Sequence, residues 1–273
     1  MTPGLLPFAV VVSGVFGLVV GSFLNVVAVR VPAGTSLVRE SRCPACDVAI
    51  KPWHNVPVAG WLILRGRCAS CGASISPRYP IVEGVTGVLF ALVAWLVGTT
   101  STAPFPETFA VLVAFLYFAA ISVVLTLIDL DTHRLPNAIV LPSYVVAGIL
   151  FVLVAVLAAE WGPLFGAAIG MAVLYAFYFV IRLIRPDGMG GGDVKLAGLI
   201  GIYLGWLGWG ALAVGAFAAF LYGGVFGIAL LLARRAGRKT AIPFGPWMIL
   251  GAWTGVFTGE AVGRWYMNLF VGA

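Results

Sequence analysis

The sequence predicts an all-α polytopic membrane protein, with about eight transmembrane helices and a small cytoplasmic domain that contains four cysteines. Hydrophobic residues make up 62% of the 273 residues and charged residues only 10%, and the mean hydropathy is +1.07. These values lie far outside those of soluble globular domains. The hydrophobic residues also form continuous runs of roughly 20, the length that a helix needs to cross a bilayer.

The apolar runs locate the expected helices in order along the chain. They begin near Leu5, Ile81, Thr108, Ala138, Leu164, Val194, Trp209 and Trp247. Hydrocarbon offers no partner for free backbone groups, and runs this long without alternation predict helices rather than the strands of a barrel. The run from Val194 is the shortest. The first run has no basic residue before it and no clear cleavage site, so we expect a helix and not a removable signal peptide.

Polar residues divide the chain into three expected parts. Residues 1–29 form the first transmembrane helix, residues 30–80 are the only long polar stretch, and residues 81–273 hold the remaining helices. The chain has no low-complexity tail and shows no clear internal repeat.

Lys and Arg residues predict how the helices are oriented. Of the sixteen, seven fall in residues 30–80, one in DLDTHRLPN, three in RLIRPDGMGGGDVK and four in RRAGRK, which leaves Arg264. The intervening connections contain none, so the positive-inside rule makes the basic connections cytoplasmic and puts both termini outside. The net charge of +6 follows from this topology and from attraction to anionic headgroups, and it requires no nucleic-acid partner.

All four cysteines lie in the polar stretch, in the pairs CPAC (Cys43 and Cys46) and CASC (Cys68 and Cys71). This spacing is close to that of zinc ribbons, in which four thiolates bind the metal and fold a segment too small for its own core. Disulfides and redox-active pairs are the alternatives, but a cytoplasmic loop is kept reducing and no thioredoxin-like pattern surrounds either pair. We therefore expect a structural zinc ion with no open position for catalysis.

Carboxylates near hydrocarbon indicate where a functional site lies, because ionisable groups are costly there. Two segments stand at the same expected boundary: LIDLDTHRLP, with Asp129 and Asp131, and RPDGMGGGDVKL, with Asp187 and Asp193. One aspartate from each could hold a water between a protonated and an ionised carboxyl, as aspartic proteolysis requires. The glycines allow close approach to a peptide strand or positive φ at a helix entrance. Taken alone, each segment is more often an ordinary loop or a solvated helix end.

Helix polarity adds an expectation about the proton of such a pair. Asp193 should open a helix, at the positive end of its dipole, whereas Asp129 should lie towards the closing turn of another. This asymmetry predicts that Asp193 is the ionised partner and that Asp129 carries the proton, within a pair that titrates in two coupled steps.

Several motifs in the same order make the chain resemble the bifunctional type IV prepilin peptidases, which are GxGD-type aspartic proteases of the membrane. The stretch GSFLNVVAVRVP is similar to the family's first helix, and the segment from CPAC to RYPIVE is similar to its cytoplasmic four-cysteine domain. IDLDTHRLPN and GMGGGDVKL are similar to its two catalytic segments, and AIPFGP is similar to a late helix entry. The resemblance covers nearly the whole chain.

The resemblance implies roles for individual residues. The first catalytic aspartate of the family falls in a D-x5-[IL]-P pattern, which Asp129 satisfies with the Leu-Pro at 135–136, whereas Asp131 lies two residues too far along. The second is the aspartate of GxGD, here Asp193. Asp187 lies six residues before it, and we expect it to be a solvated loop residue.

Four further residues belong to the second motif. Gly190, Gly191 and Gly192 complete it and are expected to form the active-site loop with Asp193. Lys195 also matches the motif. We expect it either to tune the site or contact a headgroup, or to be a lysine that only extends towards the membrane surface.

The resemblance also implies an activity and a location. Such enzymes cleave the basic leader of prepilins and pseudopilins after a glycine, on the cytoplasmic side of the bacterial cytoplasmic membrane, and they N-methylate the new N-terminal residue with S-adenosylmethionine. Residues 81–273 would then be the membrane aspartyl peptidase domain. The residues that bind the methyl donor stay unassigned, because no G-x-G-x-x-G follows a strand. Glu83 is a candidate, and a buried glutamate paired with Arg78 is an equal alternative.

Two other classes of protein have to be weighed. An ion-coupled transporter also combines many glycine-rich helices with membrane carboxylates, but its carboxylates are expected near the bilayer midplane and in inverted repeats. A membrane-tethered zinc module would need only one or two helices. The position of Asp129 and Asp193 at the expected membrane edge favours the peptidase over both.

Overall fold

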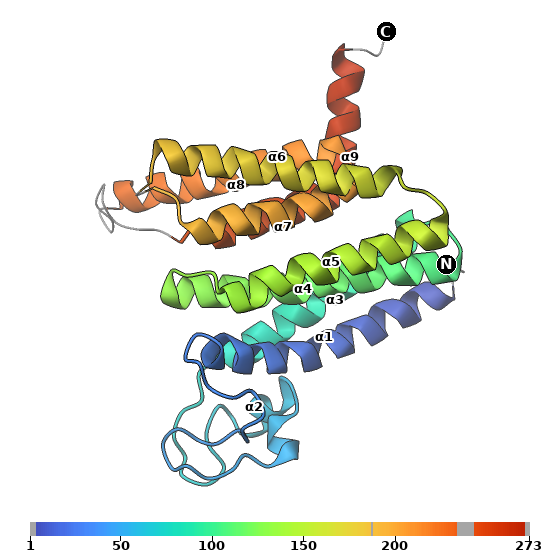
Figure 1. The fold of residues 1–273 in the computed structure, drawn as a ribbon. Coiled ribbons are helices and arrows are strands. Elements are labelled where there is room, and N and C mark those ends of the chain that lie inside the picture. Colours follow the sequence, from blue (N-terminus) through green and yellow to red (C-terminus); the bar gives the residue numbers. More distant parts are fainter. Residues whose placement is uncertain (1–3, 187, 234–242, 271–273) are drawn as a thin grey trace. The chain divides into compact units, whose positions relative to one another are not determined.

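A computed structural model of the chain describes residues 4–186, 188–233 and 243–270. In this part of the chain most residues are helical, and the β-structure consists of two isolated bridges, Arg42–Ala49 and Arg67–Ser74 (Figure 1). The long helices are α1 (Leu5–Arg30), α3 (Arg78–Thr100), α4 (Phe105–Thr132), α5 (Asn137–Ala158), α6 (Gly162–Ile184), α7 (Gly191–Leu207), α8 (Trp209–Leu232) and α9 (Gly245–Phe270). Two short helices, η1 (Pro52–Asn55) and α2 (Ala59–Ile63), lie between α1 and α3.

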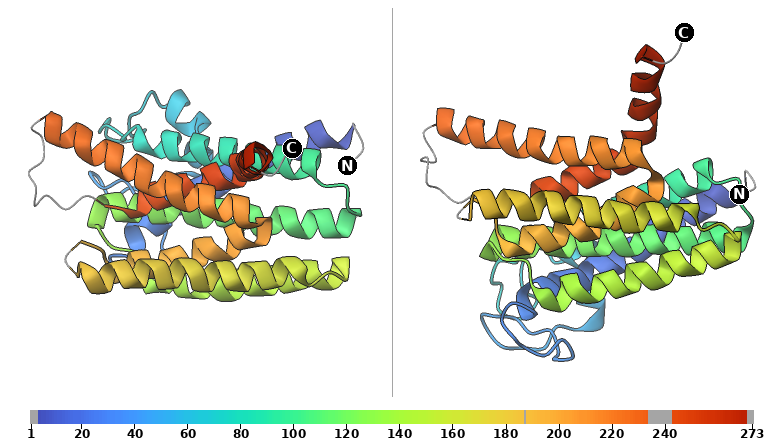
Figure 2. Two further views of the ribbon diagram at one scale, coloured as in Figure 1. Left: turned by 90° about the horizontal axis from the view of Figure 1, so that it is seen from above. Right: turned by 45° about the horizontal axis from the view of Figure 1, so that its top comes forward.

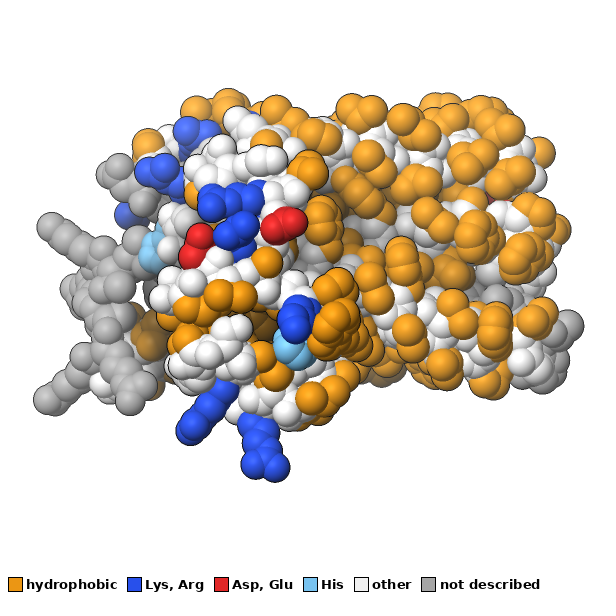
Figure 3. Space-filling view, turned by 90° about the horizontal axis from the view of Figure 1, so that it is seen from below, with side chains coloured by type: hydrophobic (Ala, Val, Ile, Leu, Met, Phe, Trp, Pro, Cys, Tyr) orange, Lys and Arg blue, Asp and Glu red, His pale blue; other side chains and the backbone are white. Residues whose placement is uncertain are grey.

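The predicted all-α polytopic fold is confirmed, and each of the eight long helices begins within three residues of its predicted position. Among the described residues, six helices are long and apolar enough to cross a membrane: α1, α3, α4, α5, α6 and α8. Hydrophobic side chains cover most of the face in Figure 3, and Lys and Arg gather at one end of it. This distribution is that of a multi-pass membrane protein.

Helix α7, predicted to be the shortest of the eight, has 17 residues. Its length is about 25 Å at 1.5 Å per residue, less than the hydrocarbon thickness of roughly 30 Å. Most of its residues from Val194 to Gly205 are buried, and it contacts α5, α6, α8 and α9. A short helix is tolerated here because protein, and not lipid, surrounds it.

The chain forms two compact units, Met1–Val124 and Leu125–Ala273, with the division inside α4. We call them the N-terminal unit and the C-terminal unit and describe each by itself. The three-part division expected from the sequence, at residues 29 and 80, stays a prediction.

In the N-terminal unit, α1 and α3 pack backbone against backbone. A Cβ atom added to Gly17 would lie 2.8 Å from the Cα of Gly87, and one added to Gly21 would lie 2.8 Å from the Cα of Glu83. Small residues at such contacts let membrane helices approach closely. The buried Asn25 side chain of α1 donates to the Tyr79 carbonyl at 3.2 Å and ties the ends of both helices together.

The C-terminal unit contains two further close pairs, α6 with α7 and α8 with α9, which run alongside each other in Figure 2. Glycines again form the contacts: a Cβ on Gly170 would lie 2.8 Å from the Cα of Gly205, and one on Gly255 would lie 3.0 Å from the Cα of Gly215. Because α7 also contacts α5, α8 and α9, the unit holds the first turn of α7 in a defined place.

Candidate active site

Asp129 lies in the last turn of α4 and is buried, with 4% of its surface exposed. The backbone N–H of Gly245 donates to its Oδ2 at 3.0 Å. Gly245 is the first residue of α9, so a free N–H group at the start of one helix satisfies a carboxylate near the end of another. The backbone N–H of His133 closes α4 by donating to the Asp129 carbonyl at 2.9 Å.

Asp193 lies in the first turn of α7. Its Oδ2 accepts the backbone N–H of Gly190 at 3.0 Å, in the manner of a capping box. The buried Tyr178 of α6 is near enough to interact electrostatically with this carboxylate. The hydrogen bond at the helix start therefore fixes where the Asp193 side chain lies.

The structure brings the two aspartates into one site, although 64 residues separate them in the sequence. Their carboxylates are near enough to interact electrostatically. Leu135 links the two backbone segments beside them: a Cβ on Gly192 would lie 2.9 Å from the Leu135 Cβ, and one on Gly245 would lie 3.5 Å from its Cδ2. The leucine of the D-x5-L-P pattern thus packs between the glycine loop and the start of α9. We call Asp129 and Asp193 the aspartate pair.

Among the three glycines before Asp193, backbone conformation explains none, and close approach explains Gly192 best. None of them is among the glycines with positive φ, and Gly190 has an extended backbone with φ −71°. A Cβ on Gly191 would collide with the guanidinium of Arg182, and one on Gly192 would press on Leu135. Gly192 is therefore the position at which Leu135 requires a glycine, whereas at Gly191 the flexible end of the Arg182 side chain can move aside.

Two other carboxylates do not join the pair. Asp131 is exposed on the last turn of α4. Glu260 is exposed on α9 and forms an ion pair with Arg264 at 3.0 Å. Asp187 lies outside the described residues, as do the basic residues of RRAGRK.

Helix polarity no longer distinguishes the two members of the pair. The expectation considered one helix for each aspartate, and it correctly places Asp193 at the start of α7 and Asp129 at the end of α4. The N–H of Gly245, however, adds a second helix start at Asp129. Both carboxylates therefore accept an N–H from a helix start, and the assignment of the proton stays an untested prediction.

The four cysteines form a cluster that could hold a metal ion, with their Sγ atoms all within 4.8 Å of one another. The Sγ atoms of Cys43 and Cys71 are 3.9 Å apart, and none of the four forms a disulfide. Four sulfurs around a zinc ion are separated by about 3.8 Å, given Zn–S bonds of about 2.3 Å. The donor set and its spacing therefore fit a tetrahedral metal.

Each half of the cluster is built by the same turn. The N–H of Cys43 donates to Val48 and that of Asp47 to Cys43, while the N–H of Cys68 donates to Ala73 and that of Gly72 to Cys68. Asp47 and Gly72, the residues after each second cysteine, both have positive φ, 53° and 73°. The sequence showed no clear repeat, yet these two knuckles are a short structural one. Backbone N–H groups of Cys71 and Ser70 lower the pKa of the Cys68 thiol to about 6.

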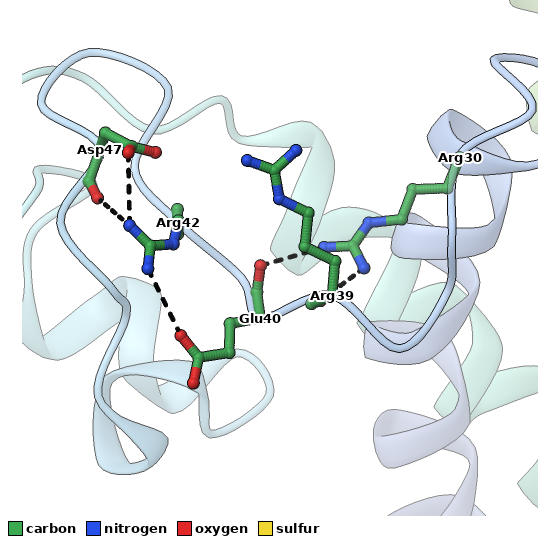
Figure 4. A network of polar contacts seen from close by, with 5 residues as sticks. All are labelled: Arg30, Arg39, Glu40, Arg42 and Asp47. Carbon is green, nitrogen blue, oxygen red and sulfur yellow. Dashed lines mark hydrogen bonds and ion pairs between the residues drawn. The ribbon is translucent and has the colours of Figure 1, made fainter.

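An arginine at the end of α1 anchors the segment that leads into the cluster. The Arg30 guanidinium donates to four backbone carbonyls between residues 36 and 40, at 2.5 to 3.3 Å. Figure 4 shows the contacts with Arg39 and Glu40. Arg42 then pairs with Glu40 at 3.7 Å and with Asp47 at 3.2 Å. These contacts connect the first knuckle to the membrane helix.

Glu83, a candidate for the methyl-donor site, accepts a backbone hydrogen bond in the structure. It is buried near the start of α3, and its Oε2 accepts the N–H of Val58 at 2.6 Å. Val58 has φ 60°, a conformation that is rare for a β-branched residue. The buried carboxylate therefore holds a strained turn of the four-cysteine domain, residues 30–80, against α3.

Sequence reasoning missed the residues that support the aspartate pair. Gly245 lies in AIPFGP, which the sequence indicates only as a helix entry, and Asn137 follows the Leu-Pro of the first motif. Asn137 accepts a hydrogen bond from the Lys195 ammonium at 2.8 Å, and Tyr144 donates to the Lys195 carbonyl. Gly245 and Asn137 lie inside motifs that the sequence analysis singled out, whereas Tyr144 lies in none.

Comparison with known proteins identifies the family of both parts of the chain. Residues 15–97 match the bacterial peptidase A24 N-terminal domain, and residues 116–232 match the type IV leader peptidase family. The first range contains the four cysteines and the second contains the aspartate pair.

Curated relatives match over almost their full length. The chain is 34% identical to the prepilin leader peptidase/N-methyltransferase of Aeromonas salmonicida, over 93% of this chain and 92% of that protein. It is 36% identical to the protein of the same name from Neisseria gonorrhoeae, over 96% of each, and 33% identical to that of Pseudomonas aeruginosa, over 92% and 91%. No solved structure matches the chain. These matches show that the chain belongs to the type IV leader peptidase family.

Proposed function

We propose that this protein is an aspartic endopeptidase that removes the basic leader peptide of type IV prepilins and pseudopilins by cutting after a glycine. The observation that carries the proposal is that Asp129 and Asp193 lie close together, on the two backbone segments that pack against Leu135, in the C-terminal unit of a leader-peptidase relative. The first aspartate comes from the last turn of α4 and the second from the first turn of α7.

The aspartate pair supplies both halves of peptide hydrolysis. The ionised carboxylate takes a proton from a water molecule while the water oxygen bonds to the peptide carbonyl carbon. The other carboxyl gives its proton to the leaving amide nitrogen as the C–N bond breaks. The pair begins and ends with one proton, and the two products are the leader with a new carboxyl group and the mature chain with a new amine.

The proposed topology places this chemistry on the cytoplasmic side. Connections rich in Lys and Arg precede α3 and α7, and the positive-inside rule assigns such connections to the cytoplasm. The aspartate pair and the four-cysteine domain would then both be cytoplasmic, in the bacterial inner membrane, with the termini outside. A substrate with a basic leader would meet the site before that leader crosses the membrane.

We further propose that Cys43, Cys46, Cys68 and Cys71 hold one structural zinc ion. Four free thiols with matching spacing support this, and with all four positions filled by sulfur the ion stabilises the domain and takes no part in catalysis.

N-methylation of the new N-terminal residue with S-adenosylmethionine is proposed from the names of the relatives. Glu83 stays an untested candidate for the methyl-donor site; in the structure it is buried and its carboxylate accepts the Val58 N–H. The methyl transfer is therefore proposed as an activity of the whole chain, and we assign none of the described side chains to it.

The transporter alternative finds no support. Asp129 and Asp193 lie in the terminal turns of their helices, whereas transporter carboxylates are expected at the midplane on broken helices. The curated relatives named above are all peptidases.

The test uses the purified full chain in lipid nanodiscs with a synthetic prepilin-like peptide, analysed by mass spectrometry. We expect a single cut after the leader glycine, and a product heavier by one methyl group when S-adenosylmethionine is present. A peptide with leucine in place of that glycine is the control and should stay intact. Failure to cut the first peptide, or equal cutting of both, would contradict the proposed specificity.

A further inference from the structure

Lys195 stands two residues after Asp193, and its contacts come from α5. Its ammonium donates to Oδ1 of Asn137 at 2.8 Å. Asn137 is the first residue of α5 and follows directly on the Leu-Pro of the first catalytic motif. The lysine side chain is therefore engaged by the segment that begins with Asp129, and its position is explained without a lipid headgroup.

A second contact reaches the backbone of the same residue. The Tyr144 hydroxyl donates to the Lys195 carbonyl at 2.5 Å. Tyr144 lies seven residues after Asn137, so both side chains point from one face of α5. A Cβ on Gly198 would collide with the Tyr144 hydroxyl, which explains why α7 has a glycine one turn further on.

Together these contacts join the segment that carries Asp129 to the turn of α7 that carries Asp193. Helix α5 follows α4 after only a short connection, residues 133–136, so its start moves with the turn that carries Asp129. Asn137 and Tyr144 hold the turn of α7 that carries Asp193. Packing of Leu135 against Gly192 alone is apolar and would let the two turns slide, whereas two hydrogen bonds fix their register.

We propose that Asn137 and Tyr144 are positioning residues for peptide cleavage, which act through Lys195 to set the separation of the two carboxylates. The proposal rests on the proposed function of the aspartate pair. It assigns Lys195 to this bridge between α5 and α7, in place of the tuning and headgroup roles considered from the sequence. A water held between two acids tolerates little change in their distance, so loosening the bridge slows the chemical step more than it weakens substrate binding.

The test compares Asn137→Leu, Lys195→Met and the double variant, in the full chain in nanodiscs, by kcat and KM for the prepilin-like peptide. Each single variant should lower kcat by about tenfold to 100-fold and leave KM nearly unchanged. The double variant should be no slower than the slower single variant, because both changes break one contact. Asn137→Asp keeps an acceptor for the lysine and should restore most of the rate, and Tyr144→Phe should cost about threefold to tenfold.

Two controls separate positioning from misfolding. Asn268→Leu, an asparagine exposed on α9, should leave kcat unchanged. Hydrogen exchange of the backbone N–H groups at 191–195 should quicken in Asn137→Leu, while exchange in the rest of α7 stays the same.

The outcomes that overturn the proposal are distinct from failure of the proposed function. If the unaltered protein does not cut the peptide, the peptidase assignment itself fails. If it does cut, and the losses of the two single variants multiply in the double variant, or only KM changes, the bridge has no positioning role. A loss in Lys195→Met that disappears in nanodiscs without anionic lipid, with Asn137→Leu fully active, would assign the lysine to a headgroup and overturn the proposal.

Discussion

The four-cysteine domain and the aspartate pair solve the same problem, the convergence of reactive side chains, in opposite ways. The cysteines come as two pairs, each shaped by one hydrogen-bonded turn, and their sulfurs lie within 4.8 Å of one another. The aspartates come from α4 and α7, and each is held by the backbone N–H of a glycine. A cluster built from local turns can be recognised by spacing alone, whereas a pair built from distant helices depends on packing.

The two regions also differ in what stabilises them. A metal ion can supply most of the folding free energy of a small four-cysteine segment. The aspartate pair depends on glycine contacts between helices, such as those of Gly170 and Gly205, in a unit that does not contain the cysteines. Damage to one region should therefore leave the other largely intact.

The largest expected effect is on the aspartate pair itself. Asp129→Asn should slow peptide cleavage by at least about 10³-fold, because the remaining carboxyl can no longer serve as both acid and base. Asp131→Asn is the matched control and should keep most of its activity, since Asp131 is exposed on the same turn. Initial rates of both variants decide the matter. An inactive Asp131 variant beside an active Asp129 variant would show that the D-x5-L-P pattern was aligned wrongly.

A second effect should be confined to the other region. Cys46→Ser should release the metal, lowering the zinc content from about one ion per chain to nearly none, and open residues 31–77 to proteases. The C-terminal unit should stay resistant to the same protease. Elemental analysis with limited proteolysis measures both, and a zinc-free unaltered protein with oxidised thiols would refute the metal assignment.

A smaller effect is expected where the pair meets the start of α9. In Gly245→Ala the new Cβ would lie 2.7 Å from Oδ2 of Asp129, so the carboxylate or α9 must move. A misplacement of about 1 Å at a catalytic group can cost about 10²-fold in kcat/KM. Gly148→Ala on α5 is the control, because a Cβ there meets no atom within 4 Å. Equal activity of the two variants would mean that the N–H of Gly245 does not position Asp129.

The smallest effect concerns the contact that holds the four-cysteine domain to α3. Glu83→Leu leaves the Val58 N–H without its carboxylate acceptor, which should cost about 1–3 kcal/mol of local stability. Protease cleavage between residues 51 and 66 should become faster, whereas Glu40→Leu, at an exposed ion pair, should change it little. If the Glu83 variant is cleaved no faster than the unaltered protein, this contact does not hold the domain to α3.

Much of the fold could be predicted from the sequence because a membrane restricts it. Apolar runs placed every long helix start within three residues, since hydrocarbon leaves helices as the workable choice. The sequence also predicted that the run from Val194 is the shortest. The sequence could not show that α7 is buried among other helices. A glycine such as Gly201 or Gly205 does not indicate which helix it packs against.

Residues of the site could be predicted only where they belong to a recognisable motif. Asp129, Asp193 and the four cysteines follow from patterns, and the structure brings each set together. The hydrogen bond from the Gly245 N–H was not predicted, because the residues around Asp129 do not indicate which backbone N–H group donates to its carboxylate. Tyr144 could not be foreseen either, since its partner is a backbone carbonyl, which every residue has.

The most direct test of the proposed catalytic site is whether Asp129 and Asp193 act as one unit. The measurement is kcat/KM for cleavage of the prepilin-like peptide by Asp129→Asn, Asp193→Asn and the double variant, with circular dichroism to verify that each remains helical. Effects of groups that act together are strongly non-additive, so we expect the double variant to be no slower than either single variant. Losses that multiply, or a single variant that keeps cleaving at near the normal rate, would contradict the aspartate pair as the catalytic site.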